Sequence, residues 1–286
     1  MNIDRDILTG YLLEDTARGD ITSDAVIPDN DSYAEINAKD NGIICGLEEA
    51  AFLFGYAGAT VVLTAADGER VSAGRKLMEI RGKAKAILLA ERTALNIIGR
   101  MSGIATKTDA MVRKARSINE EIRIAGTRKT SPGARAIDKK AVAVGGGDPH
   151  RYDLSDAFLI KDNHLAVCPA GEAIRKAREY SAYKKIEIET ESPAEALAAA
   201  EAGADIIMLD NREPAEISKA SMMIKDAGLR DRVLIEVSGG INSKNFESYA
   251  ALDIDIISMG ALTHSVRNFD VSLAMKPGVK NFTVKI

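Results

Sequence analysis

The sequence predicts an α/β protein that combines a TIM-like β/α barrel with a smaller N-terminal α/β domain. Beyond residue 120, short apolar runs alternate with helical segments, as expected of parallel strands that are buried on both faces. The first third instead carries short alternating runs separated by glycine turns. The length of 286 residues exceeds that of one ordinary domain. We place the first domain at 1–105 and the barrel at 106–269, with the tail 270–286 packed on the first domain.

The N-terminal third contains one clear helix, three strands and a long helical tract. Helical spacing at 4–14 brings Leu8, Tyr11 and Leu12 to one face. Strands are expected at 33–38, 60–64 and 77–80, with turns at 41–42 and 67–68. The helical tract runs from 84 to 115, and a break is expected at Gly99 or Gly103 because glycine weakens a helix interior. We expect this tract to join the two domains.

Seven candidate strands make up the barrel, which is therefore irregular beside the usual eight-stranded barrel. They lie at 122–126, 141–144, 157–160, 185–189, 206–209, 233–237 and 255–259. The helices between them carry clear boundary signals. Ser192, Pro193 and Glu195 combine an N-cap, a proline in the first turn and a capping-box glutamate, and Gly203 ends that helix.

The composition indicates a globular protein and argues against several classes of partner. Hydrophobic residues make up 46% and charged residues 28%, and the formal net charge of −4 gives no reason to expect a nucleic-acid partner. We expect no signal peptide, because the first residues lack a long apolar run, and no membrane helix, because no run approaches about 20 apolar residues. Cys45 and Cys168 are far apart and lack metal-ligand spacing, so we expect reduced thiols and a cytoplasmic location.

Glycine turns follow the last two candidate strands. They comprise Ser238, Gly239 and Gly240 after one strand, and Met259, Gly260 and Ala261 after the next. Backbone N–H groups at such turns bind phosphate, and barrels commonly bind phosphate after their last strands. The alternative is that both are tight turns that merely need positive φ angles. Because two such turns occur at consecutive strands, we favour a phosphate site.

Cationic residues follow the early strands, where a barrel places its active site. They are Arg128, Lys129, His150, Arg151 and Lys161. Arginine suits carboxylates, because its planar fork donates two parallel hydrogen bonds. These residues therefore predict a site for a dianionic ligand. The alternative is solvated surface charge, and Lys161 taken alone could also be a Schiff-base lysine of a barrel aldolase.

Acidic residues end the two middle strands. Glu189 and Asp210 are predicted on adjacent strands, and two carboxylates there could hold Mg²⁺ together with substrate phosphates. The alternative is a salt bridge to Lys129 or Lys161. Glu187 shares a strand face with Glu189 and is a second candidate for the same role.

At these residues the chain resembles quinolinate phosphoribosyltransferase, the decarboxylating nicotinate-nucleotide pyrophosphorylase. The strongest motifs are T-R-K-T-S-P-G at 127–133, G-G-G-D-P-H-R at 145–151 and L-I-K-D-N-H at 159–164. Weaker ones are E-D at 14–15, G-D-I-T-S at 19–23, E-R-T-A-L-N at 91–96, S-G-I-A-T at 102–106, L-D-N at 209–211, S-G-G at 238–240 and G-A-L-T-H-S at 260–265. The resemblance spans nearly the whole chain.

This resemblance implies an irregular seven-stranded barrel, a small N-terminal α/β sandwich domain and a homodimer. It implies that phosphoribosyl pyrophosphate and quinolinate react in the presence of Mg²⁺ to give nicotinate mononucleotide, pyrophosphate and CO₂ for de novo NAD biosynthesis. Arg128, His150, Arg151 and Lys161 would bind quinolinate, and Arg92 would reach the neighbouring subunit's site. Lys129, Glu189 and Asp210 would serve the sugar pyrophosphate and metal, and the glycine turns its 5′-phosphate. Lys129, Lys161, Glu189 and Asp210 are thus the expected catalytic residues.

Four other functions compete with this interpretation. A nicotinate phosphoribosyltransferase or a molybdenum-associated relative would share the fold, but the full set of cations and the intact K-D-N-H at 161–164 argue against them. A Schiff-base aldolase would depend on Lys161 alone. A non-catalytic protein that binds a phosphate ligand would not need Glu189 and Asp210.

Overall fold

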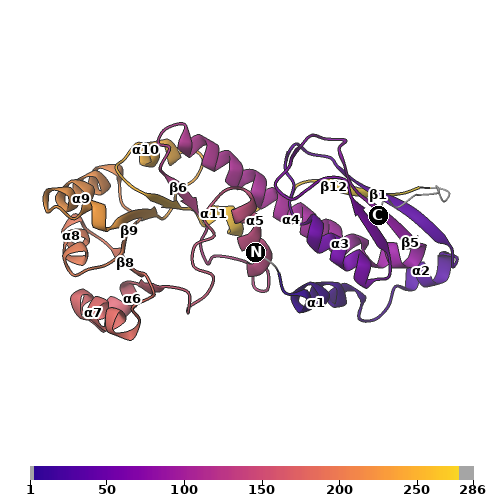
Figure 1. The fold of residues 1–286 in the computed structure, drawn as a ribbon, viewed down its shortest axis with the longest axis horizontal. Helices are drawn as coiled ribbons and strands as arrows, with labels where there is room; N and C mark the ends of the chain where they lie inside the picture. The colour runs from indigo at the N-terminus through magenta and orange to yellow at the C-terminus, as the bar shows by residue number, and fades with distance from the viewer. Residues whose placement is uncertain (1–2, 277–286) are drawn as a thin grey trace. The chain divides into compact units, whose positions relative to one another are not determined.

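The computed structural model describes residues 3–276, which fall into two compact units. The N-terminal unit consists of the described residues of Met1–Lys107, Ala136–Gly145 and Val266–Ile286. The barrel unit consists of Thr108–Arg135 and Gly146–Ser265. Figure 1 labels many of the helices and strands of each unit. Part of the tail expected to pack on the first domain, 277–286, lies outside the described residues.

A four-stranded antiparallel sheet forms the centre of the N-terminal unit. Its order is β12 (Val271–Lys276), β1 (Asp31–Ala38), β5 (Lys76–Lys83) and β3 (Thr60–Leu63). Helix α3 (Leu47–Tyr56) packs on β3 and β5, and α1 (Arg5–Thr16) packs on α3. The unit also contains α2 (Ile21–Val26) and a small ladder of β2 (Gly42–Ile43) with β4 (Arg70–Val71). Helix α1 begins at Asp4, whose carboxylate accepts the N–H of Asp6.

Helix α4 runs unbroken over Ala84–Arg116, so the break expected at Gly99 or Gly103 does not occur. Instead, the two glycines allow another backbone segment to lie close to the helix. A Cβ atom on Gly103 would overlap the carbonyl oxygen of Arg267, and one on Gly99 would lie 3.0 Å from the carbonyl oxygen of Phe269. Because glycine carries no side chain, the segment leading into β12 can lie directly against the helix.

Residues 141–144, expected as a strand, form the last turn of helix α5 (Arg135–Val144), so that prediction is wrong. A short run such as Ala141-Val142 does not by itself distinguish a buried strand from a buried helix. Polar contacts decide the outcome: Asp138, fully buried, accepts two hydrogen bonds from Arg100 at 2.7 and 2.8 Å. Two residues further along the helix, Lys140 donates to Glu49 at 2.7 Å. These contacts hold α5 in the N-terminal unit.

The barrel unit is built on six parallel strands. Their order is β6 (Arg123–Ala125), β11 (Ile256–Ser258), β10 (Leu234–Ser238), β9 (Ile206–Asp210), β8 (Ile186–Thr190) and β7 (Phe158–Ile160). Beside β6, Asp148 forms a single parallel bridge with Ala125, supported by two backbone hydrogen bonds of 2.8 Å. The structure thus has six strands and this bridge where the sequence predicts seven strands. The predicted irregular, TIM-like barrel is confirmed.

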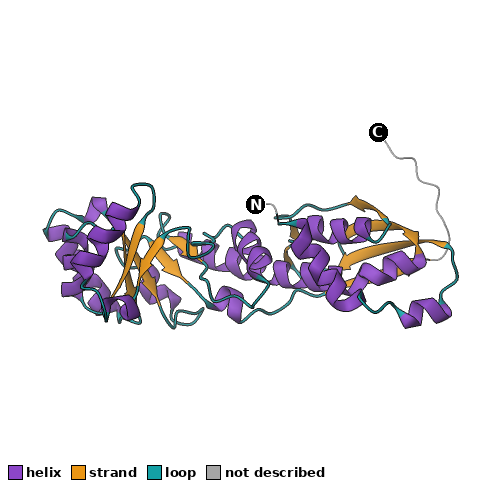
Figure 2. Ribbon diagram, turned by 90° about the horizontal axis from the view of Figure 1, so that it is seen from below, coloured by secondary structure: helices purple, strands orange, loops and turns teal. Residues whose placement is uncertain are grey.

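Helices cover one face of this sheet and leave polar side chains on the other. They are α6 (Asp162–Leu165), α7 (Ala170–Tyr180), α8 (Pro193–Glu201), α9 (Pro214–Asp226), the 3₁₀ turn Arg230–Arg232, α10 (Phe246–Ala250) and α11 (Ala261–His264). The predicted capping box is present, with Ser192 Oγ accepting the N–H of Glu195 at 3.2 Å. Figure 2 shows helices flanking the strands of this unit.

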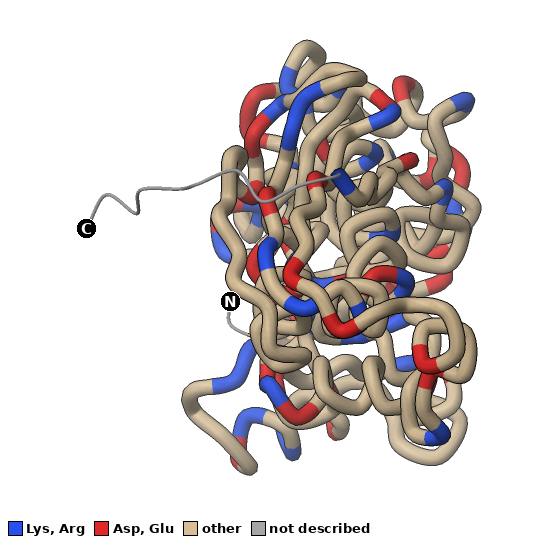
Figure 3. Tube along the Cα trace, turned by 90° about the vertical axis from the view of Figure 1, so that its right-hand side faces the viewer, with Lys and Arg blue, Asp and Glu red and all other residues tan. Residues whose placement is uncertain are grey.

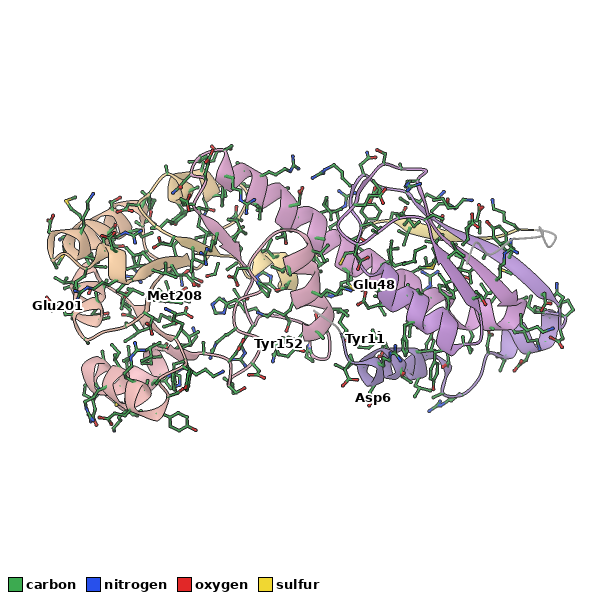
Figure 4. All side chains as sticks on the ribbon, viewed as in Figure 1. Asp6, Tyr11, Glu48, Tyr152, Glu201 and Met208 are labelled. Carbon is green, nitrogen blue, oxygen red and sulfur yellow. The ribbon has the colours of Figure 1, made fainter. Side chains whose placement is uncertain are left out.

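Strand alternation divides the barrel residues into two sets. Ile188, Leu209 and Val237 belong to the apolar core under the helices. Their neighbours, including Glu189, Asp210 and Glu236, point to the opposite face because successive side chains alternate. Register places Glu189 opposite Met208 on β9, whose side chain is labelled in Figure 4. The sheet therefore carries a row of acids into the barrel interior.

No helix among residues 3–276 is long and apolar enough to cross a membrane. Lys and Arg residues are interspersed with Asp and Glu along the chain trace in Figure 3.

Candidate active site

The two predicted glycine turns lie together at one pocket of about 270 Å³ in the barrel unit. Its lining residues are Lys129, Ser238, Gly239, Gly240, Ile241, Asn242, Ser258, Gly260, Ala261 and His264. Met259, predicted with the second turn, is not among them: it is buried and donates its N–H to Ala125. The pocket thus joins backbone amides at two turns to a lysine and a histidine, which are the groups that bind phosphate.

The two turns differ in backbone conformation. Gly239 and Gly240 have φ angles of 89° and 61°, so the first turn needs glycine for its positive φ. Gly260 has φ −60°, which any residue can adopt, and a Cβ there would lie tightly against side-chain atoms of Lys129 and His264, 3.1 Å from each. The alternative of two positive-φ turns therefore applies to the first turn only.

His264 is a pocket residue that the sequence patterns do not single out. In the structure it lines the phosphate-type pocket, and its Nδ1 lies 2.7 Å from Ser265 Oγ. Its neighbour Thr263 donates to the carbonyl oxygen of Lys129 at 2.9 Å. Helix α11 therefore holds the loop that carries Lys129 beside the second glycine turn.

The acidic residues at the ends of β8 and β9 lie on the same face of the sheet. Glu189 accepts a hydrogen bond from Lys161 Nζ at 2.6 Å, which is the salt bridge considered as an alternative. Asp210 accepts one from Asn211 Nδ2 at 2.6 Å. Carboxylate oxygens are suitable ligands for Mg²⁺. However, the one group of three possible ligands found among residues 3–276 is a different one, formed by His150, Glu187 and Glu236.

Two arginines of the predicted cationic set, Arg128 and Arg151, influence each other electrostatically in the barrel unit. Burial and the positive charge of Arg128 both lower the pKa of Arg151. The Nε atom of Arg128 is buried and donates to no acceptor within the described chain. Two guanidinium groups held near each other, one with an unsatisfied buried donor, favour the binding of an anion between them.

His150 sits deeper, between two buried acids. Its Nε2 lies 3.7 Å from Glu187 and 3.6 Å from Glu236, and its φ angle is 62°. Burial opposes the charged ring, but the two carboxylates outweigh it and raise the pKa of His150 to about 9. The hydrogen-bond geometry instead supports a neutral ring. The backbone N–H of Arg151 donates to Nδ1, so Nδ1 carries no proton. We therefore favour the neutral form of the His150 ring. Burial raises the pKa of Glu187, so the Glu187 carboxyl can hold the shared proton instead of the ring.

The remaining predicted residues are less closely grouped. Lys161 precedes α6, and its N–H donates to His164 Nδ1 at 3.0 Å. Arg92 is exposed on α4 in the N-terminal unit. Glu187 faces the interior as expected but contacts His150 rather than sharing the position of Glu189. Glu236 was missed, because within an apolar strand it gave no separate signal.

Comparison with known proteins identifies the relatives of this chain. Residues 20–102 match the family model of the quinolinate phosphoribosyl transferase N-terminal domain, and residues 104–274 match that of the C-terminal domain. A probable nicotinate-nucleotide pyrophosphorylase (carboxylating) of Archaeoglobus fulgidus is 45% identical over 255 residues, covering 89% of this chain and 97% of that protein. Its counterpart in Methanothermobacter thermautotrophicus is 42% identical over 274 residues, with 95% and 98% covered. The solved nicotinate-nucleotide pyrophosphorylase of Francisella tularensis superposes with a TM-score of 0.88 at 34% identity, covering 96% and 98% of the two chains.

The fold, the site and these matches define an enzyme of the phosphoribosyltransferase class. The chain belongs to the quinolinate phosphoribosyl transferase family. The family and enzyme class predicted from the sequence are thereby confirmed, and the nicotinate and molybdenum-associated alternatives are not favoured.

Proposed function

We propose that this enzyme transfers the phosphoribosyl group of phosphoribosyl pyrophosphate to quinolinate, with loss of CO₂, to form nicotinate mononucleotide in de novo NAD biosynthesis. The pyridine nitrogen attacks the anomeric carbon, and the bond to pyrophosphate breaks. The carboxylate next to the nitrogen then leaves as CO₂, and its electron pair takes up a proton. The observation that carries the proposal is the pair Arg128 and Arg151, whose positive charges act on each other, together with the buried Nε of Arg128, which has no acceptor among residues 3–276.

Quinolinate is a dianion and needs several fixed cations. Arg128 and Arg151 supply two guanidinium groups whose forks match its carboxylates. Lys161 supplies a third charge, and its present partner Glu189 keeps it oriented at 2.6 Å. Since the new pyridinium is positive, it absorbs the electrons left by decarboxylation, and the arginines keep the second carboxylate in place.

Phosphoribosyl pyrophosphate would occupy the neighbouring region of the same unit. Its 5′-phosphate suits the pocket of Ser238, Gly239, Gly240, Gly260 and Ala261, with Lys129 and His264 on the rim. Glu189 and Asp210 then face the sugar, where carboxylates stabilise the positive charge that develops at the anomeric carbon.

The oxygen donors of Glu189 and Asp210 fit Mg²⁺, and these are the residues that would hold it. The ion would neutralise the charge of the leaving pyrophosphate. Phosphate oxygens of the substrate would supply further donors for such an ion.

For assembly we propose a cytoplasmic homodimer, in which Arg92 reaches the quinolinate site of the neighbouring subunit. Two points support this proposal. Arg92 is exposed on α4, and it is a cation that lies outside the barrel unit.

The test is a single assay. Purified enzyme, Mg²⁺, phosphoribosyl pyrophosphate and quinolinate should give nicotinate mononucleotide, pyrophosphate and CO₂ in equal amounts. A parallel reaction with nicotinate in place of quinolinate should give no product. Turnover of nicotinate alone would assign the chain to the other reaction and refute the proposal.

A further inference from the structure

Lys161, a cation of the proposed site, lies at the start of a helix that its own side chain cannot cap. It is the N-cap residue of α6, with an extended backbone of φ −117° and ψ 169°. An N-cap side chain normally accepts a backbone N–H, but the lysine ammonium group has no acceptor. At the start of α8 the corresponding residue is Ser192, whose hydroxyl does accept one. The helix that presents Lys161 therefore needs another contact to fix its start.

Packing contributes little to holding α6 in place. The helix has four residues, and none of them is buried. A helix of this length is not stable by itself in water. A pocket of about 330 Å³ lies beside it, lined by Asp162, Leu165 and residues of neighbouring elements. Within α6, Leu165 packs against the barrel core and is half-buried. Local hydrogen bonds must therefore hold the conformation of Lys161.

His164 provides these hydrogen bonds. The backbone N–H of Lys161 donates to His164 Nδ1 at 3.0 Å, and the backbone N–H of His164 donates to the carbonyl oxygen of Lys161 at 2.8 Å. Because Nδ1 accepts, it carries no proton, and the neutral ring carries its proton on Nε2. In an ordinary capping box, a Glu or Gln at the third helical position accepts the N-cap N–H in the same way. His164 is the third residue of α6 and takes this role.

The backbone that His164 holds carries an ammonium group with a defined direction. Lys161 Nζ lies 2.6 Å from Glu189 Oε2 on β8. The Lys161 side chain is 43% exposed, and an ion pair so open to water contributes little to fixing it. A rotation of the Lys161 backbone would carry Nζ away from Glu189, because the side chain leaves from the same Cα atom. The position of Nζ therefore depends on the backbone contact as well as on the ion pair.

We propose that His164 is a positioning residue for Lys161. Its Nδ1 fixes the Lys161 backbone and the start of α6, and this directs the ammonium group toward Glu189 and toward the anion that the site binds. That anion is a quinolinate carboxylate, a statement that rests on the proposed function. His164 acts through Lys161 and not by contact with the substrate. The last residue of the K-D-N-H motif at 161–164 thereby gains a role that the cationic set does not include.

The first test detects the hydrogen bond itself, by ¹⁵N NMR on the whole enzyme without substrate. A hydrogen bond from N–H to nitrogen transmits a scalar coupling between the two nitrogens. The amide nitrogen of Lys161 should therefore couple to His164 Nδ1 at neutral pH, and the coupling should vanish in His164→Gln. A native enzyme without this coupling, or with a proton on Nδ1 of His164, would overturn the proposal.

The second test compares two variants that differ in their ability to accept a hydrogen bond. His164→Gln restores an acceptor at the capping-box position, whereas His164→Leu has none. The Leu variant should raise KM for quinolinate roughly three- to tenfold, the loss expected for one hydrogen bond, and the Gln variant should stay close to the native value. KM for phosphoribosyl pyrophosphate should change much less. Glu201→Leu, at an exposed position of the same unit, is the matched control and should change neither constant. Equal rises in the Gln and Leu variants, or none in the Leu variant, would refute the proposal.

The third test measures the position of Nζ without any substrate. An amine-specific acylating reagent labels Lys161, and mass spectrometry of the digested enzyme gives the rate. His164→Leu should be labelled faster than the native enzyme and His164→Gln, because its Nζ leaves Glu189, and thermal unfolding verifies that both variants fold. Equal rates in all three proteins would show that His164 does not position Lys161. A faster rate in the Leu variant of a chain that does not turn over quinolinate would refute the proposed function and leave the positioning role intact.

Discussion

Gly239 packs directly against Asn211, which joins the end of one strand to the turn after the next. A Cβ atom on Gly239 would overlap the side chain of Asn211 and lie 2.7 Å from its backbone nitrogen. Asn211 itself has a φ of 54°, donates its N–H to Ser238 at 2.9 Å and its Nδ2 to Asp210 at 2.6 Å. The acidic end of β9 and the glycine turn after β10 are thus one connected structure.

This contact predicts that Gly239→Ala impairs the phosphate pocket specifically. The added methyl group meets a positive φ of 89° and pushes on Asn211, with a strain cost of about 1–3 kcal/mol. KM for phosphoribosyl pyrophosphate should rise more than KM for quinolinate. Gly228→Ala is the matched control, since Gly228 also has a positive φ of 69° but no atom within 4 Å of an added Cβ. Equal effects of the two variants on KM would show that strain alone is responsible.

Lys161→Ala should leave the fold intact and remove most quinolinate-dependent activity. The Lys161 side chain is 43% exposed, so its ion pair with Glu189 contributes at most about 1 kcal/mol to stability. Loss of a charged hydrogen bond to substrate should lower kcat/KM by roughly tenfold or more. Thermal unfolding provides the control for folding. A folded variant with unchanged kcat/KM would remove Lys161 from the site.

Glu189→Ala and Asp210→Ala should each weaken Mg²⁺-dependent turnover more than quinolinate binding. Asp210 ends β9, which neighbours the strand before the first glycine turn, and Glu189 lies on the next strand, β8. Titration of Mn²⁺ in the presence of phosphoribosyl pyrophosphate, followed by its paramagnetic effect on water, measures metal binding without turnover. Normal metal affinity and normal turnover in both variants would leave Glu189 as only a salt-bridge partner of Lys161.

Arg92→Ala should lower kcat/KM for quinolinate by roughly tenfold or more, since a charged hydrogen bond is lost. The sharper measurement mixes Arg92→Ala with Lys161→Ala. In random heterodimers one of the two sites keeps both native residues, so activity should recover to about a quarter of wild type. Subunit exchange is verified by native mass spectrometry. Exchange without recovery would mean that Arg92 does not act across the interface.

Much of the barrel and its edge could be predicted from local sequence. Strand β8 alternates apolar and polar residues, and β9 is a continuous apolar run that ends in Asp210. The capping box at Ser192 marks a helix start whatever surrounds it. The glycine turns and cations that come directly after such strands are expected at one edge of the sheet, because all parallel strands end there. Local pattern therefore indicates that the glycine turns and the cationic residues lie at this edge.

Only the tertiary structure decided the points where local pattern is ambiguous. Residues 141–144 are helical because α5 makes polar contacts with distant residues, and Gly103 is needed because another segment touches it. His264 and Glu236 gain their positions from neighbours far away in sequence. The sequence by itself determined the family, the strand ends and the charges that surround the site. Tertiary structure decided which of those charges meet, since hydrogen-bond polarity, as at His150, depends on atoms brought together only by folding.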